Sequence, residues 1–179
     1  MARKGGKGRS RVAREAGEMV EEAVDKLVTR GGKRPGAGPP GLRRDVPHGF
    51  RDFPHFQDYA GRLKSRIRER YPDAEIAFQG SAVTGRSHDT HAPFDEGRVS
   101  DFDVAVSGDS LNRAARDAGV PYRGDGVSTP PLGADDLRSL GLRDVIGDAS
   151  DEAGRKVNVM IYRTMEEATA RKPSIRVWF

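Results

Sequence analysis

The sequence predicts an α+β domain built on a small mixed β-sheet with flanking helices. Three short apolar runs, at residues 74–79, 101–106 and 156–162, have the length and the side-chain alternation of strands. Segments with a helical spacing of apolar residues lie between them, without the strict alternation of parallel α/β folds. The 179 residues suit one domain of ordinary size plus an additional segment.

The additional segment is expected at the N-terminus, as a basic arm over residues 1–44 that precedes a domain over residues 45–179. Residues 1–45 contain 12 Lys/Arg and 6 Asp/Glu, whereas residues 46–179 contain 19 and 21. Apolar spacing predicts one helix from Ser10 to about Arg30, and the Gly/Pro-rich residues 31–41 are typical of a linker. Such an arm suits RNA or another acidic partner, and a solvated tail is the alternative.

Composition excludes several classes of protein. The chain has no Cys, so disulfides, thiolate metal sites and cysteine catalysis are excluded. No apolar run approaches roughly 20 residues, so we expect no transmembrane helix and no membrane partner. The basic N-terminus has no apolar stretch behind it and therefore does not resemble a secretory signal peptide.

Each element of the domain follows from its local pattern. Residues 53–70 are expected to form an amphipathic helix because apolar residues recur there at helical spacing: Phe56, Tyr59, Ala60, Leu63 and Ile67. In the strand at 74–79, Ile76 and Phe78 share one face. The remaining elements are expected as a polar stretch at 80–100, the strand at 101–106, a short helix at 109–118, a loop at 119–133, a weak helix at 134–148, the strand at 156–162, a helix near 164–171 and an extended piece at 173–179.

Two strands and the turn between them carry the chemistry. Asp101 and Asp103 share one face of their strand, and two carboxylates about 6–7 Å apart form a natural clamp for a divalent cation. Gly80, directly after the strand at 74–79, lets the backbone approach a phosphate closely. Ser81 supplies a hydroxyl and the expected start of a short helix, whose N–H groups favour an anion. A phosphate-binding turn at Gly80-Ser81 facing the metal-binding pair Asp101 and Asp103 indicates phosphoryl or nucleotidyl transfer.

The run FQGSAVTG…SDFDVAV resembles the Gly-Ser … Asp-x-Asp signature of the DNA polymerase beta-like nucleotidyltransferase superfamily. The resemblance covers about residues 55–162. It implies Mg²⁺ (or Mn²⁺) on Asp101 and Asp103, and a nucleoside triphosphate with its phosphates on Gly80, Ser81 and Thr84.

The stretch between Ser81 and Asp101 is longer than in compact members of that superfamily. It would form a flap over the nucleotide, with Arg86 or Arg98 meeting the phosphates. His88 and His91 in the same stretch would bind metal or transfer protons, or else be solvated loop residues.

The third strand departs from the superfamily pattern. Members usually carry a third carboxylate there, and the aligned residue in this chain is Asn158, whose amide cannot take up a proton or neutralise charge. Three explanations remain open. In the first, Asp101 and Asp103 alone suffice for catalysis with one or two metal ions. In the second, another acid enters from the preceding segment, such as Asp144, Asp148 or Asp151. In the third, the site binds nucleotide without turnover.

The expected function is a metal-dependent nucleotidyltransferase that moves a nucleoside monophosphate from a nucleoside triphosphate to an acceptor hydroxyl of RNA, such as a tRNA end, or of protein. Residues 77–107 and 154–177 resemble nucleotidyltransferase-like toxin domains of bacterial polymorphic toxin systems. That resemblance implies a secreted toxin that acts in the cytoplasm of its target cell, with an immunity or antitoxin protein as partner. The alternatives are a small-molecule acceptor, a non-catalytic nucleotide- or nucleic-acid-binding module, and a scaffold that uses the 10–30 helix.

Overall fold

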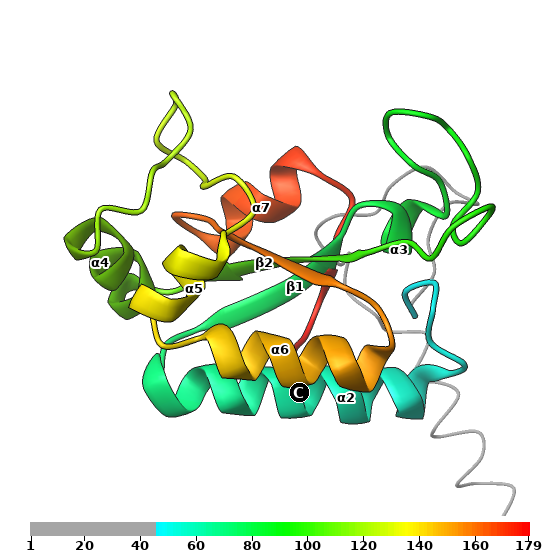
Figure 1. Cartoon of the computed structure of the whole chain (residues 1–179), viewed down its shortest axis with the longest axis horizontal. Coiled ribbons are helices and arrows are strands. Elements are labelled where there is room, and N and C mark those ends of the chain that lie inside the picture. The colour runs from blue at the N-terminus through cyan, green and yellow to red at the C-terminus, as the bar shows by residue number, and fades with distance from the viewer. Residues whose placement is uncertain (1–45) are drawn as a thin grey trace, which may run out of the picture. The chain divides into compact units, whose positions relative to one another are not determined.

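The structure is a computed structural model that describes residues 46–179, so the predicted basic arm, its helix and its linker lie outside the described residues. Figure 1 shows the described chain as a small sheet with helices packed around it. The elements in order are α2 Phe53–Arg70, β1 Glu75–Gln79, α3 Ser81–Thr84, β2 Phe102–Ser107, α4 Asp109–Asp117, α5 Ala134–Ser139, α6 Arg143–Ala153, β3 Val157–Ile161, α7 Met165–Arg171 and β4 Ile175–Arg176. The predicted small mixed sheet with flanking helices is confirmed.

The sheet has four strands in the order β3-β2-β1-β4. β1 runs antiparallel to both β2 and β4, whereas β2 and β3 are parallel. A parallel pair needs a crossover connection, and α4, α5 and α6 supply it between β2 and β3. The fourth strand consists of two residues of the predicted extended piece at 173–179.

One face of the sheet is covered by α2 and α6, which lie side by side beneath it in Figure 1. Asp52 caps α2 by accepting a hydrogen bond from the backbone N–H of His55 at 2.9 Å, and Pro54 suits the first turn, where its missing N–H has no role. The apolar residues predicted for this helix are all buried. They pack with Phe78 of β1 and Phe102 of β2, so the alternation predicted for both strands holds.

The other face of the sheet carries a second, smaller buried cluster. α7 packs on β1 and β2 there, through Met165 and Ala168. The cluster includes Ala105 and Met160, which share a face with Asp103 and Asn158. α7 therefore covers part of this face, while Asp101, Asp103 and Asn158 stay partly exposed.

The predicted single helix at 134–148 is wrong. The structure has two helices there, α5 and α6, and α6 continues to Ala153. Gly141 between them has a φ of +65°, which helical residues do not adopt, and the guanidinium of Arg70 packs against its Cα. A side chain at position 141 would collide with that guanidinium, since an added Cβ would lie 2.7 Å from the Arg70 Cζ.

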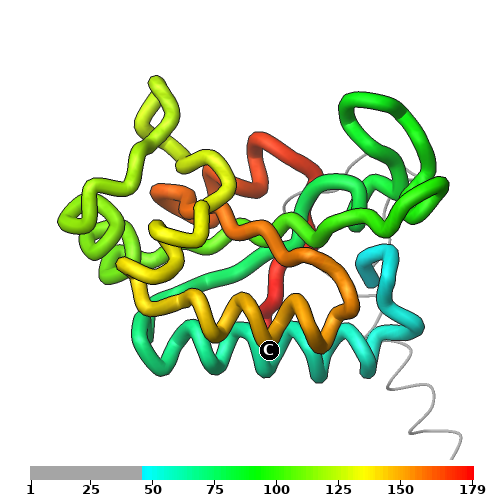
Figure 2. The backbone as a smooth tube through the Cα atoms, in the orientation of Figure 1, coloured from blue at the N-terminus to red at the C-terminus, as the bar shows by residue number. Residues whose placement is uncertain are grey.

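Two long connections lie at opposite ends of the sheet, as Figure 2 shows for the green and the yellow-green segments. The connection 85–101 joins α3 to β2. The connection 118–133 joins α4 to α5 and covers the outer edge of β3, where the N–H groups of Thr129 and Leu132 donate to β3 carbonyls at 2.9 and 2.8 Å. Within residues 46–179, none of the helices combines the length and apolar character that crossing a bilayer requires.

Candidate active site

Asp101, Asp103 and Asn158 meet on one face of the sheet. The parallel register pairs Asp103 with Asn158 on the neighbouring strand. The Asn158 Nδ2 donates to Asp101 Oδ2 and to Asp103 Oδ1, both at 3.2 Å. One amide nitrogen therefore bridges the two carboxylates that the sequence predicts as a pair.

Gly80 lies directly against the Asp103 carboxylate. Its φ of +69° favours glycine, and an added Cβ would lie 2.4 Å from Asp103 Oδ2. The Gly80 carbonyl accepts hydrogen bonds from the N–H groups of Val83 and Thr84, and so starts α3. The predicted turn from β1 into a short helix at Ser81 is present, and it places Ser81 next to the residue that touches Asp103.

Burial raises the pKa of the Asp103 carboxyl above its ordinary value. The hydrogen bond from Asn158 and the positive charges of Lys172 and Lys156 act against this rise in pKa, while the negative charge of Asp101 adds to it. Sequence reasoning missed both lysines. Lys156 is recognisable only once the register of β3 is known, and no local pattern marks Lys172.

Gln79 is a second residue that the sequence analysis missed. It pairs with Asp103 in the antiparallel register and is fully buried. Its Nε2 donates to the Ala168 carbonyl and to Ser174 Oγ, both at 2.9 Å, and so links β1 to α7 and to the segment that follows α7. Its Oε1 is buried and has no hydrogen-bond partner among the described residues.

The residues predicted to contact the phosphates, Thr84, Arg86 and Arg98, form no hydrogen bond or ion pair with the carboxylates within residues 46–179. The Thr84 hydroxyl lies 3.2 Å from the Gly80 carbonyl oxygen and 2.9 Å from that of Arg86, so it stabilises the turn after α3. The Arg86 guanidinium donates to the His91 carbonyl at 3.0 Å, and Arg98 is exposed. Between these loop residues and the carboxylate pair, the described part of the chain shows no hydrogen bond or ion pair.

The acids of the preceding segment do not complete the pair. Asp144, Asp148 and Asp151 all belong to α6, whose buried residues pack on the opposite face of the sheet. Asp148 forms an ion pair there with Arg66 of α2 at 2.6 Å. Of the three explanations for Asn158, the one in which one of these acids joins Asp101 and Asp103 is therefore wrong.

The donor set nevertheless fits a divalent cation. No group of three or more acidic, His or Cys side chains gathers anywhere in residues 46–179, so the site offers two carboxylates and one amide. Mg²⁺ is commonly held by one or two carboxylates, with water and substrate phosphates completing its shell. The Asn158 side chain has an amide oxygen as well as the nitrogen that faces the carboxylates. Which of the two faces the site depends only on the hydrogen bonds that each can make there.

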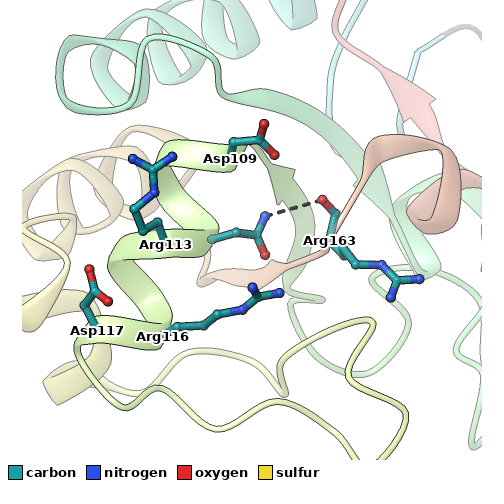
Figure 3. Close-up of a pocket in the computed structure, with 6 residues that line it drawn as sticks. Asp109, Arg113, Arg116, Asp117 and Arg163 are labelled. Atoms are coloured by element: carbon teal, nitrogen blue, oxygen red, sulfur yellow. Dashed lines mark hydrogen bonds between the residues drawn. The ribbon is translucent and has the colours of Figure 1, made fainter.

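A cavity of about 280 Å³ lies at the other end of β2. Figure 3 shows Asp109, Arg113, Arg116 and Asp117 on α4, with Arg163 across from them. α4 follows the last residue of β2, whereas Asp101 and Asp103 lie at its start. The cavity is therefore separate from the carboxylate pair.

Comparisons of the chain with protein-family models, with curated proteins and with solved structures found no match.

Proposed function

We propose that the chain is a metal-dependent nucleotidyltransferase, which moves a nucleoside monophosphate from a nucleoside triphosphate to an acceptor hydroxyl. The observation that carries this proposal is the pair of carboxylates, Asp101 and Asp103, which Asn158 bridges and of which Asp103 lies against Gly80. Keeping two adjacent carboxylates ionised on a partly buried strand costs free energy unless a cation joins them. Such a pair is typical of a site that binds a metal together with phosphates.

Asp101 and Asp103 would hold Mg²⁺ or Mn²⁺, with Asn158 orienting them. The metal supplies charge neutralisation for the triphosphate and for the departing pyrophosphate. Gly80 and Ser81 would accept the phosphates, because the missing side chain at position 80 lets the backbone lie against Asp103 and the first N–H groups of α3 have no partner inside the helix.

The proposed chemistry is one in-line displacement. The oxygen of the acceptor hydroxyl forms a bond to the α-phosphorus, and the bond from that phosphorus to the bridging oxygen breaks. Pyrophosphate leaves with the electron pair, and the hydroxyl proton is released to solvent. The chain contributes positioning and charge, and no covalent enzyme intermediate forms.

The proposed acceptor is RNA, such as a tRNA end, or protein. An RNA acceptor is supported by the excess of Lys/Arg in residues 1–45. The resemblance to toxin domains supports a secreted toxin that acts in the cytoplasm of a target cell and has an immunity protein as its partner.

A second candidate is a module that binds nucleotide without turnover. Asn158 favours it, because an amide stands in register with Asp103 where the superfamily usually has a third carboxylate. An amide nitrogen satisfies both carboxylates without metal, which a third carboxylate would not do.

Label transfer tests the proposal. The purified chain is incubated with Mg²⁺ and each of the four α-labelled ribonucleoside triphosphates, first with total RNA and then with total protein. We expect transfer that is lost in Asp103→Asn and retained in Asp151→Asn, a matched exposed carboxylate on α6.

Three results would count against the proposed function. Transfer that survives in Asp103→Asn would remove the carboxylate pair from the chemistry. Metal-dependent nucleotide binding without transfer to either pool would favour the binding module or a small-molecule acceptor. No nucleotide binding at all would refute the proposal.

A further inference from the structure

Arg155 lies in the turn between α6 and β3 and packs on two aromatic rings. Its Cζ lies 4.8 Å from the ring centroid of Phe102 and 5.0 Å from that of Phe94. Only 12% of its side chain is exposed, and its Nε is buried without a hydrogen-bond partner among the described residues. A buried guanidinium is costly, and an apolar residue often serves stability as well in such a place, so its position calls for a role besides packing.

The hydrogen bonds of the Arg155 side chain all go to the connection 85–101. Its two terminal nitrogens donate to the two carboxylate oxygens of Asp95, at 2.9 and 3.1 Å. The first of them also donates to the Ser100 carbonyl at 3.0 Å. Asp95 in turn accepts from the Ser100 N–H at 2.8 Å, and the Ser100 hydroxyl accepts from the Asp95 N–H at 3.0 Å. Arg155, Asp95 and Ser100 therefore form one closed hydrogen-bonded group.

This group holds the residue that precedes Asp101. Asp101 itself lies one position before β2 begins, so the strand ladder that fixes Asp103 does not include it. Its neighbours are held instead by the turn before β3: Arg155 binds the Ser100 carbonyl, and the Lys156 carbonyl accepts from the Phe102 N–H at 2.9 Å.

We infer that Arg155 is a positioning residue that sets the Asp101 carboxylate relative to that of Asp103, and with it the affinity of the pair for a divalent cation. The inference rests on the proposed function for the identity of the site. It goes beyond that proposal by assigning the geometry of the site to a side chain that touches neither carboxylate.

The test measures Mn²⁺ binding to the full chain by calorimetry, without nucleotide, together with thermal unfolding. Arg155→Met is expected to weaken Mn²⁺ binding about 10- to 100-fold, the usual effect of removing a group that orients metal ligands. Arg155→Lys keeps the charge and loses the two-pronged contact with Asp95, so it should fall between wild type and Arg155→Met. The matched control is Arg62→Met, which removes an exposed arginine from its ion pair with Glu152 between α2 and α6; it should leave Mn²⁺ affinity unchanged.

Asp95→Asn keeps the inference testable if Arg155→Met fails to fold. It removes the charged partner of Arg155 at a partly exposed position, and we expect Mn²⁺ affinity to fall about 3- to 10-fold with the fold intact. Mn²⁺ affinity within twofold of wild type in a folded Arg155→Met or in Asp95→Asn would overturn the inference.

Label transfer separates the two proposals. If the wild type transfers label and Arg155→Met binds Mn²⁺ as tightly as the wild type does, the positioning role alone is refuted. Weakened Mn²⁺ binding in Arg155→Met, in a chain whose wild type transfers no label, would support the positioning role and count against transfer to RNA or protein. A wild-type chain that binds no Mn²⁺ in the absence of nucleotide would refute the positioning role, whether or not label is transferred.

Discussion

Replacing Asp103 by Asn should stabilise the metal-free protein while it abolishes transfer. In the structure, Asp101 and Asp103 accept hydrogen bonds from the same amide nitrogen at 3.2 Å each, so their bonded oxygens lie about 5 Å apart. Two unit charges at that separation repel by about 3 kcal/mol at an effective dielectric constant near 20. Both side chains are partly exposed and two lysines lie nearby, which reduces the expected gain to about 1–2 kcal/mol. The asparagine oxygen can still accept from Asn158, so no hydrogen bond need be lost.

The assay is thermal unfolding in the presence of a chelator. A gain of this size corresponds to a melting temperature about 3–8 °C higher in Asp103→Asn than in wild type, for a domain of this length. The control Asp151→Asn, with an exposed carboxylate on α6, should change the melting temperature by less than about 1 °C. Added Mg²⁺ should then stabilise the wild type and leave the variant unchanged.

The pH dependence has a definite sign. Because the pKa of Asp103 is raised on folding, the wild type gains stability as pH falls through this raised pKa toward the ordinary value of 3.8. The advantage of Asp103→Asn should therefore be complete at pH 7 and shrink as pH falls toward 3.8. A variant that melts below wild type at pH 7 without metal would refute the reasoning, because the carboxylate would then be a structural hydrogen-bond acceptor.

Three further changes test other parts of the molecule. Asn158→Asp should lower the metal-free melting temperature by about 5 °C or more and raise Mn²⁺ affinity at least tenfold, measured by unfolding and calorimetry; unchanged affinity would argue against a cation at this position. Gly80→Ala and Gly97→Ala both place a side chain at a φ near +70° and should each cost about 1–2 kcal/mol in denaturant unfolding. Only Gly80→Ala collides with Asp103, so transfer should fall more than tenfold there alone, and equal activities would show that this contact is dispensable. Tyr59→Phe removes a hydroxyl that donates to a buried backbone carbonyl of α6 at 2.8 Å, and should cost about 1–3 kcal/mol in urea unfolding without changing transfer.

Much of the fold was predictable because its signals are local. The helix at 53–70 has the bounds that its apolar spacing predicts, and Phe102 faces the core with Asp103 on the other face, as strand alternation requires. Gly141 is also visible in the sequence, yet the single helix predicted across it is two helices, α5 and α6. A single glycine does not reveal from the sequence that the chain will adopt a positive φ there. In the structure, the Arg70 guanidinium of α2 occupies the space that a side chain at position 141 would need.

The sequence by itself determined which residues share a face. It placed the two carboxylates on one side of a strand and gave the neighbouring strand an amide on the same side, because side-chain direction in a strand depends only on residue spacing. Only the tertiary structure decided which residues of different strands and helices lie next to each other. The register that puts Asn158 opposite Asp103 follows a long crossover, and Gln79 and Arg155 contact residues far away in the chain. Such contacts arise from the packing of helices on the sheet, which no local pattern of residues encodes.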